Sequence, residues 1–142
     1  MPKEKVRKEA NLVLVDNCDY IVSNLNKLAR LKFSGVRKSP VVALERLLRK
    51  QCPVSRPVSV RYRDLSKEDL CGRCLVFADK AGKLSRFEIE IDPKLPDLVV
   101  IDSFMHEWAH VMDYDRNGLS RKRHRQSWGV CYAQAWSSYA DV

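Results

Sequence analysis

One segment near the end of the chain constrains the fold more than any other. Residues 98–112 carry mostly large apolar side chains, and the pentapeptide His-Glu-Trp-Ala-His lies inside this run at positions 106–110. An apolar run of this length predicts a helix that Asp97 caps, that ends near Tyr114 and that is buried on most sides. The chain therefore needs a fold that places two histidines and a glutamate within a buried helix.

The spacing inside the pentapeptide predicts a metal site. His106 and His110 lie four residues apart, so they share one face of a helix and both imidazoles can bind one ion. Zinc lowers the pKa of a bound water toward about 7, and Glu107 is placed to take its proton for attack on a carbonyl. By chance, this composition gives H-E-x-x-H roughly 0.003 times per chain. The alternative is a pair of core histidines with ordinary partners.

A third ligand is expected because a catalytic zinc ion usually has three protein ligands and one open position. The chain has 3 histidines, and the one outside the pentapeptide is His124, which follows a loop around Gly118. This loop can turn the chain back, so we predict that His124 is the third ligand. Alternatively His124 lies on the surface, or the third ligand is Asp113 or Asp115. Asp102 and Asp113 can instead orient a ligand histidine or be surface carboxylates.

A basic cluster surrounds His124. It consists of Arg121, Lys122, Arg123 and Arg125. Positive charge disfavours a protonated imidazole, and a ligand histidine must be neutral, so the cluster supports the assignment. The formal net charge of +8 favours anionic partners. These four residues are therefore candidate DNA contacts, with a solvated basic loop as the alternative.

Aromatic residues follow on the last predicted helix, residues 125–140. Trp128, Tyr132 and Trp136 recur at intervals of four, a stripe that predicts core packing. Trp128 and Tyr132 are also candidates to line the site, where the Tyr132 hydroxyl can donate a hydrogen bond to an oxyanion.

The first 50 residues are expected to be helical. A stripe of apolar residues at helical spacing predicts one long helix over residues 3–31. Its members are Ala10, Leu14, Cys18, Ile21, Leu25 and Leu28. Ser39 and Pro40 then suit the first two positions of a second helix.

The middle of the chain predicts a sheet, and the whole chain a single α+β domain over residues 1–142. Within 54–92 we expect three strands, near 58–62, 72–78 and 84–91, in a small antiparallel-type sheet. The last two form a hairpin around Gly82, and either can be an exposed edge. Residues 97–140 supply the metal-site helices.

The cysteines and the N-terminus bear on where the protein works. Five cysteines, an odd number, and a charged N-terminus without an apolar signal region predict reduced thiols and a cytoplasmic protein. No apolar run has the length of a membrane span. Cys71-Gly-Arg-Cys74 has the spacing of a zinc knuckle or redox pair, but no second such pair exists. We therefore predict a turn with two packed thiols.

Residues 101–136 resemble the SprT-like (Spartan-type) zinc metallopeptidases, especially the short forms of phages and prophages. The similar features are H-E-x-x-H, a short loop, His124, an aromatic residue four positions later, and the stretch WGVCYAQAW. A weaker similarity extends back to residue 72. One departure is Arg125-Gln126, where members often have Gly-Pro. The resemblance implies a minimal zincin-like fold, one catalytic Zn²⁺, peptide hydrolysis with Glu107 as general base, and a bacterial or phage-infected host cell.

These features lead to two functional hypotheses. The first is a monomeric zinc metalloendopeptidase that acts on proteins or peptides, including DNA-associated proteins, and not at a membrane. The second is a basic nucleic-acid-binding module whose zinc is structural or whose site is vestigial. A fourth protein ligand, such as Asp113 or Cys131, would favour the second hypothesis, whereas three ligands would favour the first.

Overall fold

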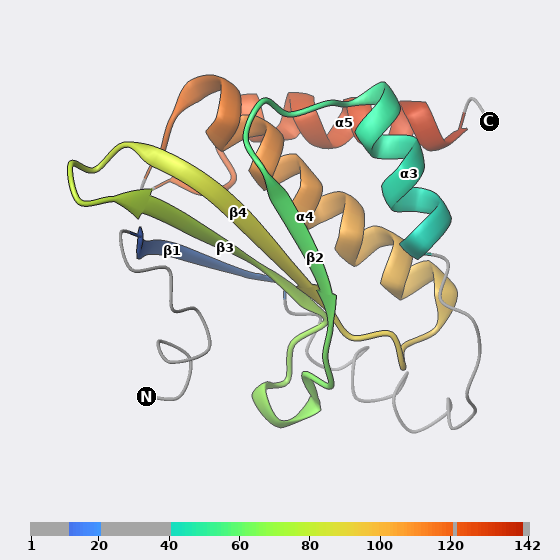
Figure 1. Cartoon of the computed structure of the whole chain (residues 1–142). Coiled ribbons are helices and arrows are strands. Elements are labelled where there is room, and N and C mark those ends of the chain that lie inside the picture. Colours follow the sequence, from blue (N-terminus) through green and yellow to red (C-terminus); the bar gives the residue numbers. More distant parts are fainter. Residues whose placement is uncertain (1–11, 21–40, 121, 141–142) are drawn as a thin grey trace.

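The computed structural model describes residues 12–20, 41–120 and 122–140, and it shows an α+β fold (Figure 1). The elements are β1 (Leu12–Tyr20), α3 (Val41–Gln51), β2 (Val58–Tyr62), a 3₁₀ turn η1 (Ser66–Glu68), β3 (Gly72–Asp79), β4 (Leu84–Ile91), α4 (Asp97–Asn117) and α5 (Gln126–Ala140). The predicted fold class is therefore confirmed. Within the described residues, no helix is both long and apolar enough to cross a membrane.

The sheet has four strands in the order β1-β3-β4-β2. β3 pairs antiparallel with β1 and with β4, whereas β2 runs parallel to β4. The three predicted strands are present and their hairpin, β3 and β4, is antiparallel as predicted, but β2 is parallel to β4 and the fourth strand, β1, was not predicted. The nine-residue connection 63–71 lets the chain step past one strand, so that β4 lies between β2 and β3. The hairpin strands are consequently interior, and the edges are β1 and β2.

The predicted helix over residues 3–31 is also wrong where the structure describes it, because residues 12–20 form β1. The remainder of that prediction lies outside the described residues. The run Leu12-Val13-Leu14-Val15 contains two β-branched residues, which suit a strand, and short apolar runs are ambiguous between helix and strand. Backbone pairing with β3 along the whole strand outweighs the helical spacing.

The other predicted elements are confirmed, with small differences at their ends, and Ser39 and Pro40, which were predicted to begin the second helix, lie outside the described residues. Gly82 has a φ of 84° in the turn between β3 and β4, as its freedom from a Cβ allows. Helix α4 continues to Asn117, and Gly118, with a φ of 79°, follows it. Asp97 does not cap this helix, because the N-cap position belongs to Pro96 and no side chain caps it.

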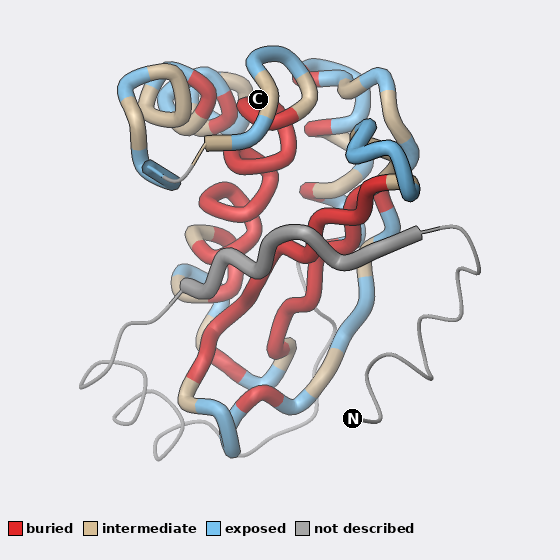
Figure 2. The backbone as a smooth tube through the Cα atoms, turned by 90° about the vertical axis from the view of Figure 1, so that its left-hand side faces the viewer, coloured by how far each residue is buried: buried red, intermediate tan, exposed pale blue. Residues whose placement is uncertain are grey.

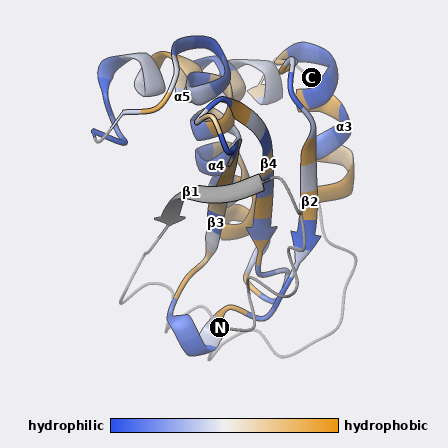
Figure 3. Ribbon diagram, turned by 60° about the vertical axis from the view of Figure 1, so that its left-hand side comes forward, coloured by the Kyte–Doolittle hydropathy of each residue, from blue (hydrophilic) through white to orange (hydrophobic). Residues whose placement is uncertain are grey.

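Helix α4 lies across one face of the sheet and is buried along most of its length (Figure 2). Both α4 and β4 contain hydrophobic segments (Figure 3), and α4 packs against β3, β4, α5 and α3. The indole nitrogen of Trp108 donates to the Cys52 carbonyl at 3.0 Å, which ties α4 to the end of α3. Cys71 and Cys74 are both buried thiols, as predicted, but they do not lie in a turn, because Cys74 belongs to β3 and Cys71 directly precedes that strand.

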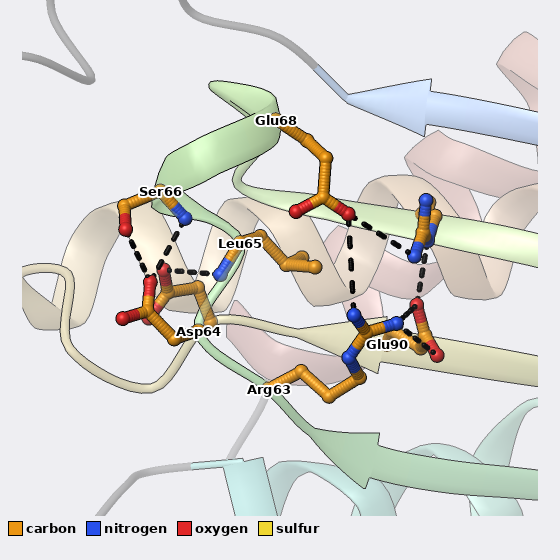
Figure 4. A network of polar contacts seen from close by, with 8 residues as sticks. Arg63, Asp64, Leu65, Ser66, Glu68 and Glu90 are labelled. Carbon is orange, nitrogen blue, oxygen red and sulfur yellow. Dashed lines mark hydrogen bonds and ion pairs between the residues drawn. The ribbon is translucent and has the colours of Figure 1, made fainter. Parts of the chain in front are cut away.

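Buried charges lie on the opposite face of the sheet. Glu90, on β4, accepts hydrogen bonds from Arg73 on β3 at 2.5 Å and from Arg63 at 3.1 Å. Glu68 lies near both guanidinium groups, so the four residues form one network (Figure 4). This network holds the end of β2 and the turn η1 against the central hairpin.

Candidate metal centre

Three histidines converge at one end of the helical layer. His106 and His110 lie one turn apart on α4, and His124 precedes α5. One ligand nitrogen from each lies within 4.8 Å of the others, and the Nε2 atoms of His106 and His124 are 3.0 Å apart. Tetrahedral zinc with bonds of 2.0–2.1 Å separates its ligand nitrogens by about 3.3 Å. The three histidines therefore form a group that can hold a metal ion.

The group is closed towards the core and open on one side. His106 and His110 are buried, at 8% and 0% exposure, whereas His124 is exposed. Both ring nitrogens of His110 are buried without a hydrogen-bond partner among the described residues. An imidazole placed in this way is unfavourable unless something binds it. A metal ion held by the three rings would supply a partner for His110, so the donor set fits such an ion.

The surroundings keep all three imidazoles neutral. Burial, aided by the charge of His124, lowers the pKa of His106 to about 4. Burial also lowers the pKa of His110 to about 2, with the other two histidines adding to the effect. For His124, burial and then the Arg123 guanidinium lower the pKa. Neutral imidazole is the form that binds metals.

Glu107 is fully buried between α4 and the sheet. Gly72, the first residue of β3, lies directly beneath it. A Cβ at Gly72 would be 3.6 Å from Glu107 Cγ and only 2.8 Å from Cδ1 of Ile91. The missing side chain therefore leaves room for Ile91 and for the backbone oxygen of Glu90, 3.1 Å from that Cβ, on the neighbouring strand, while Glu107 lies at an ordinary contact distance. The sequence analysis did not single out Gly72, although a glycine at the start of a strand is one signal of such close approach.

Trp128 and Tyr132 lie beside the histidines, on α5. The Trp128 ring centroid is 4.9 Å from that of His106 and 4.6 Å from that of His124, and it stacks on Tyr132 at 4.9 Å. The Tyr132 hydroxyl donates to Asp102, and burial together with this bond raises the pKa of Tyr132 to about 12. Both residues line the group, and Asp102 engages the hydroxyl that was predicted to reach an oxyanion.

The alternative acidic ligands are engaged elsewhere. Asp113 accepts hydrogen bonds from Arg125 and Asn117, and Asp115 from Ser55 and Arg56. Neither belongs to the histidine group, which is the only group of at least three His, Cys, Asp or Glu side chains able to hold an ion within residues 41–120 and 122–140. Cys131, the other candidate for a fourth ligand, does not belong to the histidine group either.

The basic cluster is divided by the structure. Lys122 and Arg123 are exposed, and Arg121 lies outside the described residues. Arg125 faces inwards, where its Nε donates to Asp113 Oδ2 at 2.8 Å. Of the candidate DNA contacts, Arg125 is thus held in an internal ion pair. This pair was not predicted, because its members lie twelve positions apart, on either side of a loop.

Tyr114 is a second residue that the sequence analysis missed. It lies one turn after His110 on α4, is fully buried, and stacks on the His110 ring with centroids 5.7 Å apart. Its interval of four residues from His110 was the available signal.

Comparisons with protein families, curated proteins and solved structures give no match for the chain. The resemblance to SprT-like metallopeptidases therefore stays a prediction, and the site has to be interpreted from its own geometry.

Proposed function

We propose that this protein is a zinc-dependent metallopeptidase of the SprT-like type. The observation that carries the proposal is the convergence of three neutral imidazoles on one point, with a buried carboxylate on the residue next to the first of them. Three nitrogen ligands with an open side are typical of a catalytic zinc site, whereas structural zinc sites are closed by four protein ligands.

Each residue has a role in the proposed reaction. His106, His110 and His124 would hold the ion, which supplies Lewis acidity for activating water and polarising a peptide carbonyl. Glu107 would be the general base that takes a proton from water, because it directly follows His106 and does not belong to the histidine group. Trp128 packs edge-on against the His106 and His124 rings and would help to orient them.

The second candidate function is nucleic-acid binding with a structural or vestigial zinc. The net charge of +8 and the exposed Lys122 and Arg123 beside the histidines favour it. It differs from the first in requiring no contribution from Glu107. The two functions are compatible if the substrates are proteins bound to DNA, because the basic residues would then bring the enzyme to those substrates.

The substitution Glu107→Gln separates these functions. For a peptidase, the variant binds zinc with the stoichiometry of the parent chain and loses hydrolysis of an unfolded protein substrate. Glu45→Gln, on α3, is the matched control and should retain both properties. Folded protein without stoichiometric zinc would contradict the metal site. Equal behaviour of parent and Glu107→Gln in hydrolysis, with salt-dependent DNA binding, would favour the second function.

A further inference from the structure

We propose that the ion pair between Asp113 and Arg125 is a clasp that positions His124 for metal binding. The inference rests on the proposed function, and it assigns to Asp113 and Arg125 a positioning role in the same site. Neither residue touches the point where the three imidazole nitrogens converge. They act through the loop that carries the third ligand.

The inner half of the clasp is fixed on helix α4. Asp113 follows His110 by three residues and is 0% exposed. Its Oδ1 accepts a hydrogen bond from Asn117 at 3.0 Å, and its Oδ2 accepts one from Arg125 at 2.8 Å. The carboxylate is thus anchored on the same rigid element as two of the ligands.

The outer half ties both ends of the loop together. Besides pairing with Asp113, Arg125 donates through Nη2 to the carbonyl oxygen of Gly118. Gly118 is the residue that ends α4, and Arg125 follows His124 directly. One guanidinium therefore joins the start of the loop, its end and the helix, and the His124 backbone lies next to this junction.

The energetic consequence is preorganisation. A loop held in place by the fold has already lost the conformational freedom that metal binding would otherwise have to remove. Without the guanidinium contacts, metal binding would have to order the loop, and the entropy lost in doing so would weaken the affinity for the metal. Groups that orient metal ligands typically contribute about 10- to 100-fold in metal affinity.

The structure also supplies a matched control on the same helix. Asp115, two residues after Asp113, pairs with Arg56 at 2.7 Å and accepts hydrogen bonds from Ser55. The two ion pairs are similar in length and burial. The Asp115 pair, however, holds the segment before β2 and has no link to His124.

The experiment compares Asp113→Asn and Arg125→Lys with Asp115→Asn. Zinc affinity is measured by competition with a chromophoric chelator, and the ligand set is read from the visible absorption spectrum of the Co²⁺-substituted protein. We expect Asp113→Asn to bind zinc about 10- to 100-fold more weakly and to change the Co²⁺ spectrum. Arg125→Lys should lie between this variant and the parent chain. Asp115→Asn should lower the thermal midpoint similarly while leaving affinity and spectrum unchanged.

Parent-like affinity in Asp113→Asn, or an equal loss in Asp115→Asn, would overturn the clasp. A second measurement does not depend on metal: amide hydrogen exchange of the segment 118–125 in the presence of chelator. Exchange there should be faster in Asp113→Asn than in Asp115→Asn, and equal rates in the two would also overturn the inference. If the parent chain binds no zinc, the proposed function fails and exchange alone decides the clasp. If Asp113→Asn does not fold, Arg125→Lys decides both measurements.

Discussion

His110 offers the most direct test of the metal centre, because its two ring nitrogens are buried without a hydrogen-bond partner among the described residues. In the metal-free protein this arrangement opposes folding. The substitution His110→Leu removes both polar atoms and keeps a side chain of similar size. We therefore expect the variant to be more stable than the parent chain when metal is withheld, which is unusual for a fully buried residue.

The size of the effect follows from the local contacts. A buried polar atom that lacks its partner costs about 1–3 kcal/mol. Leucine loses the stacking of His110 on Tyr114, a contact worth about 0.5–1.5 kcal/mol. With the imidazole treated as one unsatisfied group, the midpoints of these two ranges leave a net gain of about 1 kcal/mol in the free energy of unfolding. For a chain of this size, this gain corresponds to a rise in Tm of about 2–4 °C.

Zinc should reverse the order of stability. A ligand that binds only the folded state adds about 2.7 kcal/mol at a free concentration 100 times its Kd. The parent chain gains this amount, whereas His110→Leu loses a ligand and gains little. Thermal unfolding is measured for both proteins in chelator and then in buffered zinc. His110→Leu should have the higher Tm in chelator, and the parent chain should have the higher Tm in zinc.

His124→Leu is the control, since His124 is exposed. It should lose the response to zinc without gaining stability in chelator. A lower Tm for His110→Leu than for the parent chain in chelator would refute the reasoning about buried nitrogens. A parent chain whose Tm does not respond to zinc would refute the metal site.

Three further predictions concern the framework of the site. Gly72→Ala should lower the free energy of unfolding by about 1–3 kcal/mol in urea titration, because its Cβ would lie 3.1 Å from the backbone oxygen of Glu90 and 2.8 Å from Cδ1 of the buried Ile91. Trp108→Phe should cost about 1–3 kcal/mol in the same assay, since the hydrogen bond to the Cys52 carbonyl is lost. Burial raises the pKa of Glu90, but hydrogen bonds and charge from two arginines outweigh burial and leave it below 4.5. Its stabilising effect is therefore complete above pH 4.5 and is lost as the pH falls through the lower folded value, so Glu90→Gln should flatten this part of the acid unfolding profile.

Most of the candidate site could be predicted because its chemistry is local. His106 and His110 share a helix face through their spacing alone, and a buried helix follows from the apolar residues around them. His124 could be nominated because it is the one histidine outside the pentapeptide. Its position in space depends on a loop whose path no periodicity records.

The errors in the fold have the opposite cause. Residues 12–20 have a helical spacing of apolar side chains, yet they form β1 because β3 offers a backbone partner along their whole length. In the same way, the parallel pairing of β2 with β4 depends on how residues 63–71 pass a neighbouring strand. Pairings between distant segments decide both cases, and a short window of sequence does not contain them.

Arg125 belongs to a local charge pattern and also makes a contact with a distant residue. Its role shows that a count of basic residues does not by itself identify a DNA-binding surface. In the sequence it is one of four basic residues in a row around His124, so it is counted with a surface that could attract DNA. In the structure its charge is matched by the buried carboxylate of Asp113. The positive charge near the histidines then comes, among the described residues of the cluster, from Lys122 and Arg123. A basic run beside a ligand can therefore serve two ends, since one member orders the loop while its neighbours face solvent.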